Sequence, residues 1–243
     1  MRYYNFLNEN RTQEITDQYF NSLLERNCSY FLSKKFKIYR GMKKNILFGY
    51  IDPTKSIRKS RYSLNYYTIM FDEILPSWEG WPKRSKSIIC STSLSYAHGY
   101  GNIYEIYPYD NNRIGICSEN DIWDSFKRSF FQNLNAFSET LQNISRIFNH
   151  NLKENKESLI QLFEILDSYG LDEILDKLRN NRESVGVRLL KDKDKDKTTL
   201  EHFDKMFNPI SNGFNNYTTL TYKHQNNKEV WIEGPCLLKN VTG

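Results

Sequence analysis

The feature that most constrains the fold is a long stretch of helical periodicity, with strand-like segments on both sides of it. Over 123–148, apolar side chains recur every three or four residues, a spacing that places them on one face of a helix. Ser118 and Asp121, just before this stretch, resemble a helix capping box. The same spacing returns over 159–178. The pattern therefore predicts a helical insertion at about residues 119–207.

Five shorter segments have the composition of β-strands. Residues 102–108 alternate between two faces, and residues 228–238 return to strand character near the C-terminus. The other three are short apolar runs beside turns, at 36–41, 87–93 and 111–117. Strands at this spacing favour an antiparallel or mixed sheet. We therefore expect an α+β fold in a single domain spanning residues 1–243.

Three further segments complete the expected organisation. Residues 12–26 have the spacing of an amphipathic helix, and residues 65–75 are apolar enough to form either a helix or a strand. The alternating run KDKDKDK at 191–197 predicts a solvated loop.

Composition narrows the classes of function. The four cysteines are far apart, without a CxxC pair or a Cys/His cluster, which argues against a zinc site. The N-terminal sequence lacks the apolar core of a secretion signal, and no run approaches the ~18 apolar residues of a membrane helix. We therefore expect reduced thiols, a cytoplasmic location, and neither a membrane nor a metal as partner.

Positive charge is concentrated in one part of the chain. Residues 34–86 contain 13 Lys or Arg and 4 Asp or Glu, a local charge of +9 in a chain whose net charge is +5. Such a segment suits the phosphates of a nucleotide or of a nucleic acid. A solvated basic face would have the same composition, so both interpretations stay open.

Three motifs place polar groups on or beside apolar strands. They are KIYRG, which contains Arg40, SIICSTS, which ends in Ser91, Thr92 and Ser93, and NKEVWIEG, which contains Glu229. A charged residue on such a strand is costly unless it is paired or exposed in a cleft. Arginine suits phosphate oxygens, and a carboxylate can bind a ribose hydroxyl and stabilise positive charge on the sugar. The set suits a nucleotide whose glycosidic bond is broken.

In this order, the three motifs resemble those of the ADP-ribosyltransferase superfamily, in its R-S-E or cholera-toxin-like class. The resemblance covers about 36–116 and 215–238 and leaves the central helices outside it. It implies an ADP-ribosyltransferase-like split antiparallel β-sandwich with an N-terminal helix and a large helical insertion. It also implies NAD as the substrate, without a metal.

The resemblance implies roles for the residues of the three motifs. Arg40 would contact the phosphate or ribose region of NAD, and the backbone of Gly41 would face the nicotinamide amide. Glu229 would be the catalytic carboxylate that promotes departure of nicotinamide, and Ser91 would brace it.

Neighbouring residues receive supporting roles from the same resemblance. Thr92 and Ser93 would support the NAD site, and Tyr96 or Tyr100 would stack on the nicotinamide ring. Arg84, just before the second motif, could reach phosphates.

Several assignments near the catalytic carboxylate stay open. Asn227 stands where the family often has a Glu or Gln that positions the acceptor, and an amide can still donate and accept there. Glu233 projects to the same strand face as Glu229 and is an alternative catalytic acid. His98 and His224 are candidate bases.

The expected activity is therefore transfer of ADP-ribose from NAD to RNA, DNA or protein, with release of nicotinamide. The absence of a secretion signal fits an intracellular toxin, an anti-phage effector or a phage-encoded enzyme, and the insertion could bind a neutralising protein such as an antitoxin. Two alternatives are a NAD glycohydrolase and a non-enzymatic nucleic-acid-binding protein that uses residues 34–86. A third is a helical interaction protein with an inert cleft.

Overall fold

A computed structural model describes residues 12–59, 64–126 and 134–241. The chain divides into two compact units. The sheet unit comprises the described parts of Met1–Tyr62, Gly80–Ser125 and Gly213–Gly243, and the helical unit those of Ser63–Glu79 and Phe126–Asn212. Most of the expected insertion at 119–207 belongs to the helical unit, which also includes the earlier segment Ser63–Glu79.

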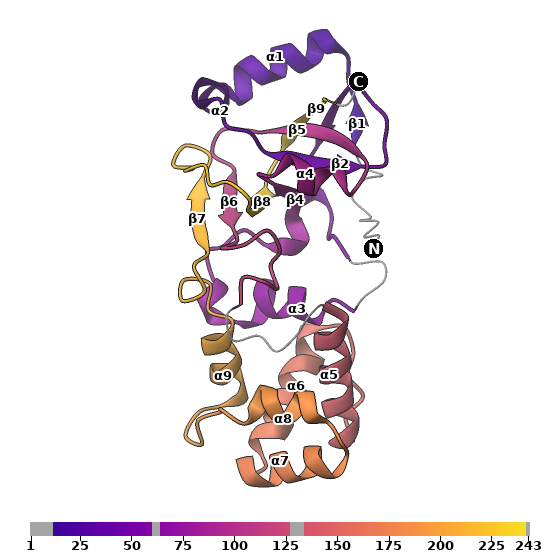
Figure 1. Cartoon of the computed structure of the whole chain (residues 1–243), viewed down its shortest axis with the longest axis vertical. Coiled ribbons are helices and arrows are strands. Elements are labelled where there is room, and N and C mark those ends of the chain that lie inside the picture. The colour runs from indigo at the N-terminus through magenta and orange to yellow at the C-terminus, as the bar shows by residue number, and fades with distance from the viewer. Residues whose placement is uncertain (1–11, 60–63, 127–133, 242–243) are drawn as a thin grey trace. The chain divides into compact units, whose positions relative to one another are not determined.

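The sheet unit is built on nine antiparallel strands in the order β1-β3-β9-β5-β2-β4-β8-β6-β7 (Figure 1). The combination of this sheet with helices confirms the α+β class. The strands are β1 Gln13–Glu14, β2 Tyr39–Met42, β3 Phe48–Ile51, β4 Ser87–Ser91, β5 Asn102–Pro108, β6 Arg113–Ile116, β7 Asn215–Thr218, β8 Glu229–Glu233 and β9 Cys236–Asn240.

The sheet is nearly interrupted between β2 and β4. A single residue pair, Tyr39 with Ser91, joins these two strands, whereas five pairs join β4 to β8. The interruption leaves a five-stranded part from β1 to β2 and a four-stranded part from β4 to β7.

Three helices belong to the sheet unit: α1 Asp17–Asn27, α2 Ser29–Lys34 and α4 Leu94–His98. The helix expected over 12–26 begins only at Asp17, because the Thr16 hydroxyl accepts a hydrogen bond from the Tyr19 amide and caps the first turn. The residues before it form β1, which pairs with β3. Apolar side chains of α1 and α2, including Phe20 and Phe31, enter the core beside the strands.

The helical unit contains six helices in its described part. They are α3 Tyr66–Ile69, α5 Leu134–Ile147, α6 Lys156–Asp167, α7 Leu171–Asn180, α8 Ser184–Leu190 and α9 Thr199–Met206. Residues 65–75 are therefore helical, with a wider helical turn at Met70–Ile74 after α3. The apolar faces of the helices in this unit are buried around side chains such as Leu162, Phe203 and Phe207.

The long helix expected over 123–148 is shorter in the structure. Its described part is α5, whereas Trp123 lies in an irregular turn and Phe130 lies outside the described residues. The expected capping box is also wrong: the Asp121 carboxylate accepts a hydrogen bond from the Trp123 amide, 2.9 Å away, and closes a local turn.

The charged run at 191–197 is a loop, as predicted, but part of it is buried. Lys193 has only 8% side-chain exposure, and its Nζ lies 3.5 Å from Asp167 of α6. Lys195 and Lys197 pair with Asp172 and Glu201. These three lysine ion pairs connect the loop to neighbouring helices.

Across the described chain, every helix is too short or too polar to cross a bilayer.

Candidate functional site

The three motifs lie on neighbouring strands of the sheet unit. Arg40 is in β2, Ser91 ends β4 and Glu229 begins β8. Ser91 is directly opposite Glu229 across the β4–β8 ladder, and opposite Tyr39, the neighbour of Arg40, at the joint with β2. All three residues are buried, with whole-residue exposures of 4–7%. The fold thus brings together residues that are up to 189 positions apart in the chain.

Each of the three consecutive hydroxyls has a distinct structural role. The Ser91 hydroxyl accepts a hydrogen bond from the Ser93 amide at 3.0 Å. The Thr92 hydroxyl accepts from the Lys228 amide at 2.9 Å, which ties the end of β4 to the residue before Glu229. The Ser93 hydroxyl caps α4 by accepting from the Tyr96 amide at 3.4 Å. These three hydrogen bonds therefore fix the end of β4 and the starts of α4 and β8.

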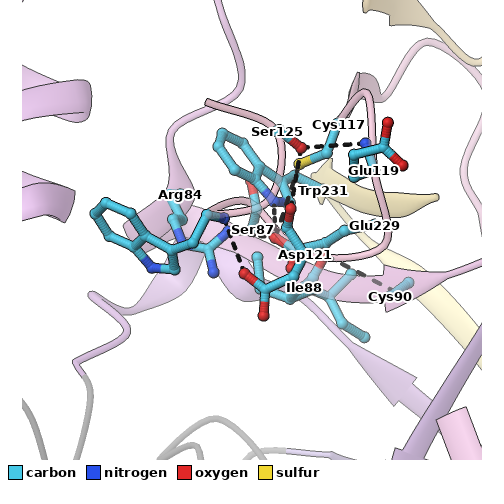
Figure 2. Close-up of polar contacts among 12 residues, drawn as sticks. Arg84, Ser87, Ile88, Cys90, Cys117, Glu119, Asp121, Ser125, Glu229 and Trp231 are labelled. Atoms are coloured by element: carbon cyan, nitrogen blue, oxygen red, sulfur yellow. Dashed lines mark hydrogen bonds and ion pairs between the residues drawn. The ribbon is translucent and has the colours of Figure 1, made fainter. Parts of the chain in front are cut away.

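The Glu229 carboxylate is held by donors that converge on one oxygen (Figure 2). Its Oε1 accepts hydrogen bonds from Arg84 Nη1 and from Trp231 Nε1, both at 2.6 Å. The Cys117 thiol lies 3.9 Å from the same oxygen. Arg84 and Glu229 form a buried ion pair, with side-chain exposures of 5% and 9%.

The second oxygen of Glu229 has a different environment. Among the described residues, none forms a hydrogen bond to Oε2, and none joins the Ser91 hydroxyl to Glu229. The expectation that Ser91 braces Glu229 is therefore not met by a direct contact. Arg84, which was expected to reach a phosphate, forms an ion pair with Glu229.

Arg40 bridges the interrupted part of the sheet. Its Nη1 donates a hydrogen bond to the Ile89 carbonyl of β4. Next to it, Gly41 has no room for a side chain, because a Cβ there would lie 2.0 Å from the Ala97 carbonyl oxygen. A glycine at position 41 therefore allows α4 to pack closely on β2.

Two tyrosines from the end of α4 lie in the field of these charges. The rings of Tyr96 and Tyr100 are 5.9 Å apart. Burial raises the pKa of both hydroxyls, and the charge of Glu229 raises them further. Arg40 acts on the pKa of Tyr100 in the opposite direction. The charges of Arg40 and Glu229 thus act on the pKa of Tyr100 in opposite directions.

A second carboxylate, that of Asp121, shares this environment. Burial raises the pKa of Asp121, and repulsion by Glu229 adds to the effect, while Arg84 opposes it. The loop that carries Asp121 is fixed to β8, since the Cys117 amide donates to the Glu229 carbonyl at 2.9 Å and the Glu229 amide to the Glu119 carbonyl at 3.0 Å. Burial and the charge of Glu229 therefore both disfavour the ionised form of Asp121.

The remaining candidates lie apart from the Glu229 carboxylate. Asn227 is exposed and has a positive φ of 57° in the turn before β8. Glu233 pairs with Arg113 at 3.2 Å and accepts from the Lys83 amide. His98 is exposed at the end of α4. His224 stacks on Phe36, with ring centroids 5.9 Å apart.

Sequence reasoning missed Arg84 as a partner of Glu229, and also Asp121 and Trp231. One signal was present for Trp231, because a residue two positions after Glu229 on a strand projects to the same face. Asp121 was attributed to a helix cap. Nothing in local spacing indicated Arg84, which is 145 residues from Glu229.

The arrangement supplies a fixed anionic oxygen beside aromatic rings and a buried cation. Such a carboxylate can accept a hydroxyl proton in a hydrogen bond and stabilise positive charge that develops nearby. In the described part of the chain, no three His, Cys, Asp or Glu side chains gather closely enough to hold a metal ion.

Comparison of the chain with protein-family models, curated proteins and solved structures finds no match in any of the three.

Proposed function

We propose that the protein is an NAD-dependent mono-ADP-ribosyltransferase, which transfers ADP-ribose to an intracellular macromolecule and releases nicotinamide. The observation that carries the proposal is the position of Arg40, Ser91 and Glu229 on the adjacent strands β2, β4 and β8. The near-interruption of the sheet between β2 and β4 also suits the split antiparallel sandwich of that superfamily.

The proposed reaction assigns a task to the Glu229 carboxylate. Its Oε2 accepts a hydrogen bond from a ribose hydroxyl, and its charge stabilises the positive charge that develops on the sugar. The C–N glycosidic bond breaks, and its electron pair passes to the nicotinamide nitrogen. A lone pair of the acceptor forms the new bond to the same carbon, and the acceptor's proton passes to solvent.

The other residues of the motifs support binding in this proposal. Tyr96 and Tyr100 flank the nicotinamide, while Gly41, Thr92 and Ser93 shape the backbone around it. Because Arg40 is buried and bonded to Ile89, it supplies positive charge from beneath the diphosphate and fixes the strands.

The acceptor is proposed only as a class. The basic segment 34–86 favours RNA or DNA, and a protein is the alternative. A toxin, an anti-phage effector or a phage-encoded modifier would each use such an activity, with Asn227 positioning the acceptor. The helical unit is the candidate surface for a neutralising protein.

The test is incubation of the protein with NAD labelled in its adenylate part, in the presence of total cell protein, RNA or DNA. Release of nicotinamide and label on one acceptor class are measured for the wild type and for Glu229→Gln. Glu233→Gln is the matched control, because this residue lies on the same strand and pairs with Arg113.

The proposal predicts labelling by the wild type and by Glu233→Gln, with a loss of roughly 100-fold or more in Glu229→Gln. Free ADP-ribose as the sole product would indicate a NAD glycohydrolase instead. Binding of nucleic acid without release of nicotinamide would contradict the enzyme and favour a binding protein. Loss of activity in Glu233→Gln alone would transfer the catalytic role to that residue.

A further inference from the structure

Among the described residues, the Glu229 carboxylate is held through Oε1 alone, by two side chains that come from different elements. We propose that Arg84 and Trp231 are positioning residues, which fix Glu229 through Oε1 so that Oε2 meets the substrate. The inference rests on the proposed function, because it assigns a role within that reaction.

The contacts define the orientation of the carboxylate. Arg84 Nη1 and Trp231 Nε1 both donate to Oε1 at 2.6 Å. The Arg84 guanidinium also lies over the Trp231 ring, with its Cζ 4.8 Å from the ring centroid. The three side chains thus brace one another, as Figure 2 shows. Rotation of the carboxylate would break two charge-assisted hydrogen bonds at once.

The backbone that carries Arg84 is itself fixed. Arg84 opens a short turn, Arg84–Lys86, that leads into β4. The amide of Lys83, the residue before Arg84, donates to the Glu233 carboxylate at 3.2 Å. The Ser87 hydroxyl donates to the Lys83 carbonyl at 2.7 Å. The Ser85 carbonyl accepts from the Arg58 amide at 2.7 Å. Arg84 therefore reaches Glu229 from a turn that is held on both sides.

Trp231 is equally well fixed. It follows Glu229 by two residues in β8 and has 1% exposure. Its ring packs near Phe214, with centroids 6.2 Å apart. An indole N–H on such a ring is a donor with little freedom to move.

A contribution to stability does not by itself explain the buried ion pair between Arg84 and Glu229. Burial of two charges costs desolvation energy that their attraction offsets only in part, and an apolar pair of similar volume is often as stable. A reactive carboxylate has a different requirement, because misplacement by about 1 Å can cost roughly 100-fold in rate. The buried pair meets that requirement by holding the Glu229 carboxylate in one orientation.

A positioning role predicts a particular kinetic signature. Glu229 acts most strongly on the charge of the transition state, so disturbing its orientation lowers kcat and leaves KM for NAD nearly unchanged. A residue that only binds NAD would raise KM instead.

The experiment measures nicotinamide release at varied NAD concentration for wild type, Arg84→Met, Arg84→Lys and Trp231→Phe. Trp231→Phe removes one N–H and keeps an aromatic ring under Arg84. The matched control is Arg179→Met, which breaks an exposed ion pair with Asp176 in α7. Circular dichroism and thermal unfolding establish which variants are folded.

We expect kcat to fall roughly 10- to 100-fold in Arg84→Met and Trp231→Phe, with partial recovery in Arg84→Lys and no change in Arg179→Met. Adding Arg84→Met to Glu229→Gln should cause no further loss. If Arg84→Met does not fold, the kcat of folded Trp231→Phe tests the positioning role. If folded Trp231→Phe or folded Arg84→Met keeps the wild-type kcat, the positioning role is overturned and the proposed function is not. Absence of nicotinamide release by the wild type overturns the proposed function, and the inference with it.

Discussion

At the scale of single residues, Asp121 is a carboxylate whose ionised form is disfavoured in the folded protein. Burial and the charge of Glu229 raise its pKa above the ordinary value of 3.8. The unfolded chain therefore releases this proton at a lower pH than the folded chain does. Between the two pKa values the folded state binds more protons, so this residue makes the protein less stable as the pH rises.

Asp121→Asn should consequently raise the free energy of unfolding at pH 7, by about 1 kcal/mol or less. The amide oxygen can still accept from the Trp123 N–H, so the local turn survives. The gain should shrink at pH 4. Urea unfolding at both pH values tests this, with the exposed Asp176→Asn in α7 as the control. An equal gain at both pH values would contradict the electrostatic explanation.

The cysteines give a second prediction at this scale. All four, Cys28, Cys90, Cys117 and Cys236, are buried free thiols. Burial raises the pKa of Cys28 and of Cys90 to about 12. Because the thiolate is the reactive form, a thiol reagent at pH 8 should modify none of them in the native protein. In guanidinium chloride it should titrate four thiols per chain. Rapid reaction of a native thiol would disprove this burial.

The site shows how far residue types can be predicted from sequence. Arg40, Ser91 and Glu229 could be singled out because each puts a polar group on an apolar strand. The partner of Glu229 could not, because Arg84 is 145 residues away and approaches it only through the pairing of β4 with β8. Local spacing also gave no indication that the three hydroxyls bond to backbone amides.

At the scale of elements, Asp167 connects the end of α6 to the start of α9. Its Oδ1 accepts from the Thr199 amide at 2.8 Å and from the Thr199 hydroxyl at 2.6 Å. Thr199 is fully buried. Asp167→Ala would leave two buried donors without this acceptor and should cost about 1–3 kcal/mol of unfolding free energy.

The control for this prediction is Asp176→Ala in α7. Asp176 also forms an ion pair, with Arg179, but the side chains are 67% and 58% exposed. An exposed pair of this kind contributes less than about 1 kcal/mol. Chemical denaturation compares the two variants, and equal losses of stability would refute the role of Asp167 in joining α6 to α9.

Helix positions followed from periodicity, but their ends did not. Apolar spacing predicted α6 and α7, because their buried faces repeat every three or four residues. The start of α1 is set instead by the Thr16 hydroxyl, and α4 begins at the Ser93 cap, so a serine expected to serve a binding site also starts a helix. Caps depend on single hydrogen bonds that a periodic pattern does not contain.

At the scale of the whole molecule, the α+β class was predictable and the strand order was not. Alternation predicted strands at 102–108 and 228–238, but nearly every residue of β5 is buried and the second segment is divided between β8 and β9. Which strands become neighbours depends on pairing between distant segments: β9 lies between β3 and β5, although it is last in the chain. The two units are likewise built from alternating chain segments.

Because each unit buries its own apolar side chains, we predict that damage to one core spreads mainly within that unit. Leu162 of α6 is fully buried in the helical unit, and Leu238 of β9 in the sheet unit. Leu162→Ala should lose about 2–5 kcal/mol and accelerate amide hydrogen exchange mainly in α6 and α9. Leu238→Ala should instead accelerate exchange in β5 and β9. Hydrogen-exchange mass spectrometry measures both patterns, and uniform acceleration in either variant would show that the chain opens as one cooperative unit.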